Sequence, residues 1–408
     1  MSDAVLAPLG QVVACRDCDG VQCVPDQPWG GNFSCFRCGG VLVQRRHRDL
    51  DFFLAVTLGL AVLFFLAASQ TFLTIDVHGT SQDCTMYSGV LALADAGFIG
   101  LAGLVGFTLF GAPCARIIGL LYVLVPLRAG RLAPRTAEVF RWVQKLGPWA
   151  MLDVLVLAVI VAAVKLGELA SIELGPGMAA FLGLVVLWTV SRDRLDPTWV
   201  FEAVAPTVSG VGPGRTACAV CGQGVALDGG DVQKCSRCGG RVHARKPDSL
   251  ARTTALVAGA ALLYVPANFY PILNFETLGV SGPQTILSSV GILFASGMWP
   301  IASILFFASI LVPLLKLVGL STLIAVVRRG SGRPVEATRM FRLIDYIGRW
   351  SMIDVLVLAL LVSLVQMGSV ATITPGIGAT CFGAVVVLTI LGAQSFDPRL
   401  IWDTRRKA

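Results

Sequence analysis

The feature that most constrains this chain is a duplication, because three segments recur at an offset of 200 or 201 residues. The matching pairs are GPWAMLDVLVLAVIVAAVKLG (147–167) with GRWSMIDVLVLALLVSLVQMG (348–368), LDPTWVF (195–201) with FDPRLIW (396–402), and PCARIIGL (113–120) with PLLKLVGL (313–320). A repeat of this length encodes a complete structural unit. We therefore expect two tandem copies of one module.

The repeated segments are strongly apolar. Hydrophobic residues make up 55% of the chain and charged residues only 14%, against about 25% charged in soluble domains. Several apolar runs exceed the roughly 20 residues needed to cross a bilayer. The net charge of +7 does not indicate nucleic acid, because the basic residues cluster beside the ends of apolar runs. The composition predicts an all-α polytopic integral membrane protein.

Each copy is predicted to contain four membrane-spanning helices. The segments 85–96 and 285–298 carry Gly, Ser or Asp and are expected to be short and partly inserted, so five crossings per copy is the alternative. The expected spans are 52–73, 97–127, 148–169 and 174–191 in the first copy, and 251–272, 299–327, 347–369 and 375–393 in the second.

Lys and Arg set the predicted orientation, since short cytoplasmic loops are rich in both. Basic residues gather between the second and third helices of each copy, whereas the loops at 74–84 and 272–282 contain none. The N-terminus lacks the basic-then-apolar order of a cleaved signal peptide. We expect both termini and both basic loops in the cytoplasm, and an even number of crossings makes the repeats parallel.

Eight of the twelve cysteines form four C-x-x-C pairs. Two such pairs, separated by sixteen residues in the first head and thirteen in the second, are typical of a tetrahedral zinc ribbon. Gly39 and Gly239 follow the last pair of each head and permit the positive φ of a metal-binding turn. The predicted ligands are Cys15, Cys18, Cys35 and Cys38, then Cys218, Cys221, Cys235 and Cys238. Iron in a rubredoxin-like site and a redox-active dithiol are the alternatives to two structural zinc ions.

These features divide the chain into heads and membrane blocks. Each predicted four-helix transmembrane module is preceded by a small cytosolic zinc ribbon, which metal must help to fold because it is too small for a sufficient core. The expected domains are zinc ribbon 1 (1–48), transmembrane module 1 (49–200), zinc ribbon 2 (210–248), transmembrane module 2 (249–402) and a cytosolic tail (403–408).

Charged residues inside the apolar spans need an explanation, because a charge in hydrocarbon costs several kcal/mol. In the second copy Lys316 lies in the second span and Asp354 near the start of the third; Arg116 and Asp153 hold the equivalent positions in the first. We expect each base to face the bundle interior and pair with its acid. A buried salt bridge that fixes helix register and a titratable pair are the two interpretations.

Hydroxyl groups accompany the pair in the second copy, and the first copy is poorer in them, with Trp188 or Thr189 at the position of Thr389. Ser309 is seven residues before Lys316 and Ser351 three before Asp354, so each lies on the face of its charged neighbour. Thr389 of the last helix is expected to complete the cluster. The first copy carries Leu109 and Ala150 at the first two positions. A proton relay is therefore expected mainly in the second copy.

The duplicated ribbon and four-helix block, with PLLKLVGL and WSMIDVLVLALLV, resembles the paraquat-inducible protein A family of bacterial inner-membrane proteins over essentially the full length. The resemblance implies membrane blocks arranged like tetraspanin or claudin-type proteins. It also implies a phospholipid transporter, proton-driven, that works with a periplasmic tunnel of MCE domains. By position, the family's polar network falls on Ser309, Lys316, Ser351, Asp354 and Thr389, and the zinc ligands on the eight paired cysteines.

We therefore expect an inner-membrane lipid transporter component and not an enzyme. Two other functions are kept as alternatives. A redox-active membrane protein would use the C-x-x-C heads, and a passive anchor would only seat a tunnel protein in the membrane.

Overall fold

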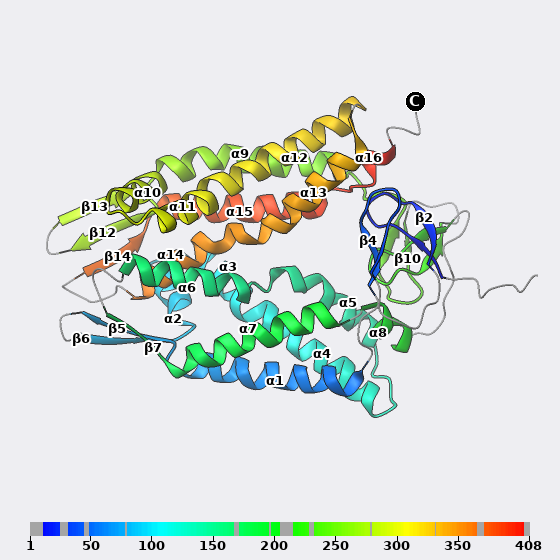
Figure 1. Ribbon diagram of the computed structural model, residues 1–408, viewed down its shortest axis with the longest axis horizontal. Helices are drawn as coiled ribbons and strands as arrows, with labels where there is room; N and C mark the ends of the chain where they lie inside the picture. The colour runs from blue at the N-terminus through cyan, green and yellow to red at the C-terminus, as the bar shows by residue number, and fades with distance from the viewer. Residues whose placement is uncertain are drawn as a thin grey trace, which may run out of the picture.

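In the computed structural model, long helices run side by side between two small β-sheets at one end and the cysteine-bearing hairpins at the other (Figure 1). The structure describes residues 11–24, 32–44, 49–77, 80–166, 171–195, 197–204, 215–227, 232–277, 280–330, 332–364 and 371–403. Within these ranges the side chain of Asp354 is not described.

The first membrane module is built from helices that are mostly apolar on all sides, as expected for helices facing both lipid and a packed core. Asp49 caps its first helix by accepting hydrogen bonds from the N–H groups of Asp51 and Phe52. In chain order the helical elements are α1 (Leu50–Ser69), α2 (Ser88–Asp95), α3 (Ile99–Gly106), the π-helical η1 (Phe107–Gly111), α4 (Ala112–Arg128), α5 (Thr136–Leu146), the 3-10 turn η2 (Gly147–Trp149), α6 (Leu152–Leu166), α7 (Pro176–Arg194) and α8 (Pro197–Val204).

The second module repeats this order element by element, which confirms that the chain is a structural duplication. Its elements are α9 (Ser249–Phe269), α10 (Ile286–Ala295), α11 (Trp299–Phe306), the π-helical η3 (Phe307–Leu311), α12 (Val312–Arg329), α13 (Pro334–Gly348), the 3-10 turn η4 (Arg349–Met352), α14 (Ile353–Leu364), α15 (Ile377–Ser395) and α16 (Leu400–Asp403).

Within the described residues, six helical segments are long and apolar enough to cross a membrane, so the protein is a multi-pass membrane protein. They are Leu50–Ser69, Ile99–Arg128, Thr136–Ala163, Ser249–Phe269, Ala302–Arg329 and Ile377–Ser395. Two further predicted spans fall on α7, whose C-terminal end is charged, and on α14, which has twelve described residues. The count of four crossings per copy stays a prediction. The short segments expected at 85–96 and 285–298 are the short helices α2 and α10.

The membrane part is not all-α, and this corrects the sequence prediction. Each module carries a three-stranded antiparallel sheet, formed by β5 (Leu73–Val77), β6 (Thr80–Cys84) and β7 (Ser171–Leu174) in the first, and by β12 (Leu273–Thr277), β13 (Val280–Gln284) and β14 (Ala371–Pro375) in the second. The middle strand pairs with a neighbour in the hairpin and with a strand nearly 100 residues away. Local periodicity does not reveal so distant a partner.

The basic stretches predicted as loops form amphipathic helices instead. In α5, Phe140 and Val143 lie three residues apart on the buried face, and α5 packs on α4; α13 packs on α12 in the same way. Spacing of apolar residues at i and i+3 among charged residues is the pattern of such a helix.

Each module has a π-helical segment just before a proline, at η1 and η3. Pro113 and Pro313 lack an N–H and disturb the regular hydrogen-bond ladder. In the second module the Val312 N–H reaches back to the carbonyl of Phe307, and the Tyr264 hydroxyl donates to the carbonyl of Ile310 at 3.0 Å. The segment places Ser309 inside the module.

The two modules share one apolar core. Helices α6 and α14 pack against each other at the centre, and α2 of the first module also packs on α14. The largest buried cluster includes Leu152 and Leu155 of the first module together with Leu356 and Val362 of the second. A common core of this kind holds the copies as one body.

Candidate metal centres and inter-module cavity

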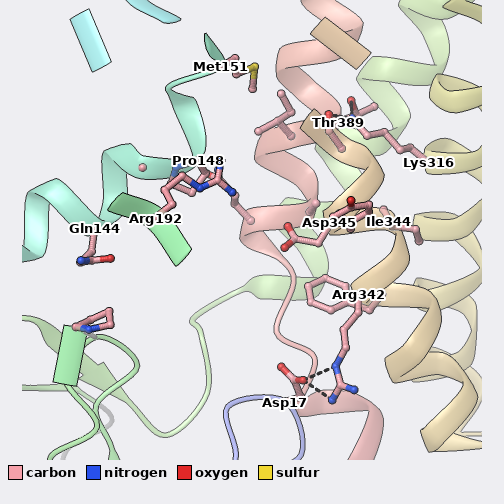
Figure 2. A pocket seen from close by; sticks show the side chains of 18 of the residues that line it. Asp17, Gln144, Pro148, Met151, Arg192, Lys316, Arg342, Ile344, Asp345 and Thr389 are labelled. Carbon is pink, nitrogen blue, oxygen red and sulfur yellow. Dashed lines mark hydrogen bonds and ion pairs between the residues drawn. The ribbon is translucent and has the colours of Figure 1, made fainter. Parts of the chain in front are cut away.

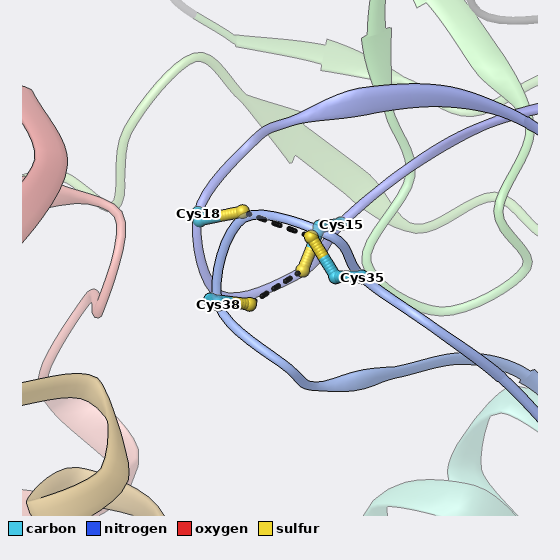
Figure 3. A group of neighbouring side chains, drawn as sticks. All are labelled: Cys15, Cys18, Cys35 and Cys38. Atoms are coloured by element: carbon cyan, nitrogen blue, oxygen red, sulfur yellow. Dashed lines mark hydrogen bonds between the residues drawn. The ribbon is translucent and has the colours of Figure 1, made fainter. Parts of the chain in front are cut away.

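The eight paired cysteines gather into two buried clusters. Sγ atoms of Cys15 and Cys38 lie 3.5 Å apart, as do those of Cys18 and Cys35 (Figure 3). In the second cluster Cys218 and Cys238 are 3.6 Å apart, and the four sulfurs of each cluster lie within 4.8 Å of one another. Tetrahedral thiolates at the Zn–S distance of about 2.3 Å are separated by roughly 3.8 Å. The residues fit a four-coordinate metal ion.

Backbone turns hold each ligand pair. The first cysteine of a pair donates its N–H to a carbonyl five residues later and accepts an N–H from four residues later. The strands that carry these turns are β1 (Gln11–Ala14), β2 (Val21–Val24), β3 (Asn32–Ser34), β4 (Val41–Gln44), β8 (Arg215–Ala217), β9 (Gly224–Ala226), β10 (Val232–Lys234) and β11 (Arg241–His243). The residue after the last pair of each head has positive φ, 69° at Gly39 and 64° at Gly239, which confirms the expected use of both glycines.

The first ribbon docks on the second module. Arg342 of α13 donates to the Asp17 carboxylate at 2.7 Å, to the Cys38 carbonyl at 3.1 Å and to the Cys38 Sγ at 3.1 Å. Arg37 stacks over the ring of Trp402, with its Cζ 4.4 Å from the ring centroid. A guanidinium beside a metal-binding sulfur offsets the negative charge of four thiolates.

The second ribbon docks on the first module through equivalent positions. Arg141 of α5, which the repeat aligns with Arg342, donates to the Cys238 carbonyl at 3.0 Å. Arg237 donates to the carbonyl of Phe201, the residue that corresponds to Trp402. The ribbons also contact each other, since Arg245 bridges Asp19 and Asp403 at 3.0 and 2.6 Å. Each copy therefore binds the head of the other.

A cavity of about 610 Å³ lies between the modules near the ribbons. Gln144 and Arg192 reach it from the first module and Lys316, Asp345 and Thr389 from the second, with the Asp17–Arg342 pair at its edge (Figure 2). Arg116 and Lys316, which occupy equivalent positions, both line it. Gly147 and Pro148 of η2 line it from the first module, and Gly348 at the end of α13 lines it from the second.

Lys316 is 1% exposed although it carries an amine, so the predicted interior position is confirmed. Its Nζ donates to the Gly348 carbonyl at 2.9 Å and lies 3.5 Å from the Thr389 Oγ1. The lysine stem packs closely on this backbone, since a Cβ at Gly348 would be in van der Waals contact with the Lys316 Cε at 3.4 Å. Lys316 and Thr389 are thus brought together, whereas the expected pairing with Asp354 lies outside the described residues.

In the first module the acid and base do not pair as expected. Asp153 forms its ion pair with Arg192 of α7 at 3.6 Å. Arg116, 7% exposed, stacks on the ring of Trp188 at 4.9 Å. The physical reason is that α7 supplies a second guanidinium, which the sequence prediction did not consider.

Ser309 and Ser351 are both 1% exposed, and neither hydroxyl has a hydrogen-bond partner within the described part of the chain. Ser309 lines a separate small cavity of about 40 Å³ together with Leu305 and Leu361. The structure therefore buries the predicted hydroxyls, but it places Ser309 away from the larger cavity.

Sequence reasoning missed the residues that join the heads to the modules. The charge pattern marks Arg141 and Arg342 only as basic loop residues, although both copies keep arginine at this position. Repetition of a charged residue in otherwise divergent segments is the signal that could have found them. Arg192 carries no such signal, because its equivalent is Ala393.

Comparison with known proteins gives a consistent result. The paraquat-inducible protein A profile matches residues 50–205 and 250–406. The intermembrane transport protein PqiA of Escherichia coli K12 is 32% identical over 96% of this chain and 95% of its own length. The lipophilic envelope-spanning tunnel protein A of the same strain is 29% identical over 97% and 92%, and a probable intermembrane transport protein of Haemophilus influenzae is 27% identical over 97% of both. No solved structure gives a significant match. The chain belongs to the paraquat-inducible protein A family.

Proposed function

We propose that this protein moves phospholipid between the bacterial inner membrane and a periplasmic MCE-domain tunnel, and that proton movement at Lys316 drives it. The relatives named for intermembrane transport support the transport role. The buried Lys316 amine beside an inter-module cavity is the observation that supports coupling, since an ionisable group in a span marks a pathway or relay. In this proposal the protein is not an enzyme, and its termini and ribbons are cytoplasmic.

Proton coupling would act through the packing of Lys316. Its described contacts are two neutral oxygens, which accept from a charged or a neutral amine alike. Gain of a proton adds a charge that must be balanced by Asp354, by the cavity or by movement of the helices. Two packings that differ in proton affinity exchange population as the proton binds.

The test is lipid movement by the full-length protein in proteoliposomes, with and without an imposed pH gradient. We expect Lys316→Met to abolish the gradient-dependent part, while Lys145→Met, the same change at an exposed site, retains it. Gradient-independent movement in every variant rejects proton coupling. The passive anchor is favoured if Lys316→Met leaves lipid movement unchanged while changes in the heads prevent assembly with the tunnel protein.

We further propose zinc as the metal of both ribbons. Metal analysis should give about two zinc ions per chain, one for each cluster of four cysteines. Cys35→Ser should remove one of them. A coloured protein containing iron, or thiols that cycle through disulfides with no metal bound, supports the alternatives instead.

A further inference from the structure

Arg116 stands out among the buried charges because no charged or hydrogen-bonding group compensates it within the described chain. Its Nε is buried without a hydrogen-bond partner, and one face of its guanidinium is covered by Trp188. Buried polar groups normally have partners, so the unsatisfied guanidinium of Arg116, which lines the inter-module cavity, points to a bound acceptor.

The charged residues around the inter-module cavity differ in how far their side chains are buried. Asp17 pairs with Arg342, and Arg192 pairs with Asp153. The remaining acids on the wall, Asp193 and Asp345, are exposed. Arg116 and Lys316, one from each module, are the deeply buried charges of the wall. The two buried cations differ in their charged neighbours, because Asp345 acts electrostatically on Lys316 whereas the charged neighbour of Arg116 is Arg192. Arg116 is therefore the buried cation of the wall that is better placed to bind an anion.

The chemistry of the two buried cations selects the ligand class. A guanidinium donates paired hydrogen bonds that match phosphate and carboxylate oxygens, and a nearby ammonium adds a point charge. The volume of about 610 Å³ is within the range of about 300–1,000 Å³ for small-molecule sites. Met151, Ile344 and Ile390 add apolar wall, which suits the glycerol and first acyl carbons beside a phosphate.

We infer that this cavity binds a phosphate group, either the diester of a lipid headgroup or the free anion. Arg116 is its main ligand and Lys316 the second. Two sources share this chemistry, a phospholipid headgroup and free inorganic phosphate. The lipid source rests on the proposed transport function, whereas the phosphate chemistry does not.

The experiment places the photocrosslinker benzoylphenylalanine at Met151 of the full-length protein. The protein is reconstituted in nanodiscs of phosphatidylcholine and phosphatidylglycerol whose phosphate is radiolabelled, and crosslinking of lipid to the protein is measured. We expect light-dependent labelling that falls about tenfold in Arg116→Gln and is partly restored in Arg116→Lys, because lysine keeps the charge but not the paired donors. The matched control, Arg131→Gln at an exposed turn, should label normally. Equal labelling of Arg116→Gln and the parent overturns the inference.

A second variant controls for the possibility that Arg116→Gln loses labelling because it misfolds. Ile390→Trp narrows the cavity and leaves Arg116 in place, so it should also lose labelling while both variants keep the metal content of the parent. Full labelling of Ile390→Trp overturns the inference. In a parallel arm, binding of radioactive inorganic phosphate is measured. If this binding depends on Arg116 and prevents labelling by lipid, the site is assigned to free phosphate. Absence of Arg116-dependent binding of either probe overturns the site.

Lipid movement measured on the same preparations separates this inference from the proposed function. Movement by a parent protein that never labels disproves the phosphate site and leaves transport standing. Arg116-dependent labelling without lipid movement supports the phosphate site and disproves the proposed transport. Both together, with movement reduced in Arg116→Gln, support the two proposals jointly.

Discussion

The two membrane modules bury a cation at the same place but compensate it differently. In the first, Arg116 stacks on Trp188; in the second, Lys316 contacts Thr389, which the repeat aligns with Trp188. The residue at the position of Arg192 differs as well. Asp153 is held by Arg192, whereas Ala393 stands at the position of Arg192 in the second module and offers no charge.

Under the two proposals made above, this difference gives each copy the task that its chemistry suits. A guanidinium keeps its proton under nearly all conditions, whereas a lysine amine loses it far more readily when buried. An arginine with a fixed charge suits binding of an anion. A buried lysine whose described hydrogen-bond partners are the Gly348 carbonyl and the Thr389 hydroxyl suits the proposed uptake and release of protons.

The largest expected effect separates the two cations. Lys316→Met should reduce gradient-driven lipid movement about 100-fold, because the proton site is lost, while Arg116→Met should reduce it only about tenfold by weakening lipid binding. Transport rate against lipid concentration distinguishes the two, since the arginine change should act on half-saturation. If both variants lost rate and half-saturation to the same extent, the two cations would not have separate tasks.

Ala393→Arg gives the second module the arginine of the first. If Asp354 is then held as Asp153 is, the proton response should fall about tenfold, as expected when a charged partner stabilises one protonation state by about 1.4 kcal/mol. The pH dependence of transport measures the effect. Ala393→Leu adds bulk without charge, and an equal loss there would mean that packing is the cause.

The docking of the heads differs between copies on a smaller scale. Arg342 makes three polar contacts with the first ribbon, and Arg141 makes one described contact with the second. Arg141→Ala should cost about 1.5 kcal/mol, the lower end for one hydrogen bond of a charged group, and Arg342→Ala about 3 kcal/mol because it removes three contacts. Metal release to a chelator, followed for one ribbon at a time in Cys35→Ser and Cys235→Ser backgrounds, checks the order.

The smallest expected effect is acid sensitivity at Asp397, in the repeated Asp-Pro motif. Burial by itself raises the pKa of this carboxyl, but hydrogen bonds from the Arg399 guanidinium and the Lys246 N–H outweigh burial and lower the pKa. Its stabilisation is therefore complete above the pKa of the unfolded chain and is lost as the pH falls through the lower, folded value.

Thermal unfolding in detergent across an acidic pH series tests this prediction. Asp397→Asn should lose about 1 kcal/mol near neutral pH, the scale of one ordinary hydrogen bond, because the amide keeps one oxygen acceptor. The variant should also be less sensitive to acid than the parent. A parallel decline of both proteins would show that other carboxyls control acid unfolding.

The cysteine sites could be predicted from the sequence because their ligands are close along the chain and their spacing is specific. The burial of Lys316 followed from its place in an apolar repeat. The sheets could not be predicted, since Phe275 of β12 pairs with Ile373 of β14 and nothing local marks either partner. Likewise, the Arg342–Asp17 contact joins residues 325 positions apart, and only the repetition of an arginine hinted at it.

The exchange of heads bears on the origin of the duplicated chain. If a single module kept the contacts seen here, its docking arginine would bind the head of a second copy rather than its own. Joining two such exchanged partners end to end yields one polypeptide whose halves remain mutually dependent. Half-length fragments expressed alone should therefore associate pairwise rather than persist as isolated modules.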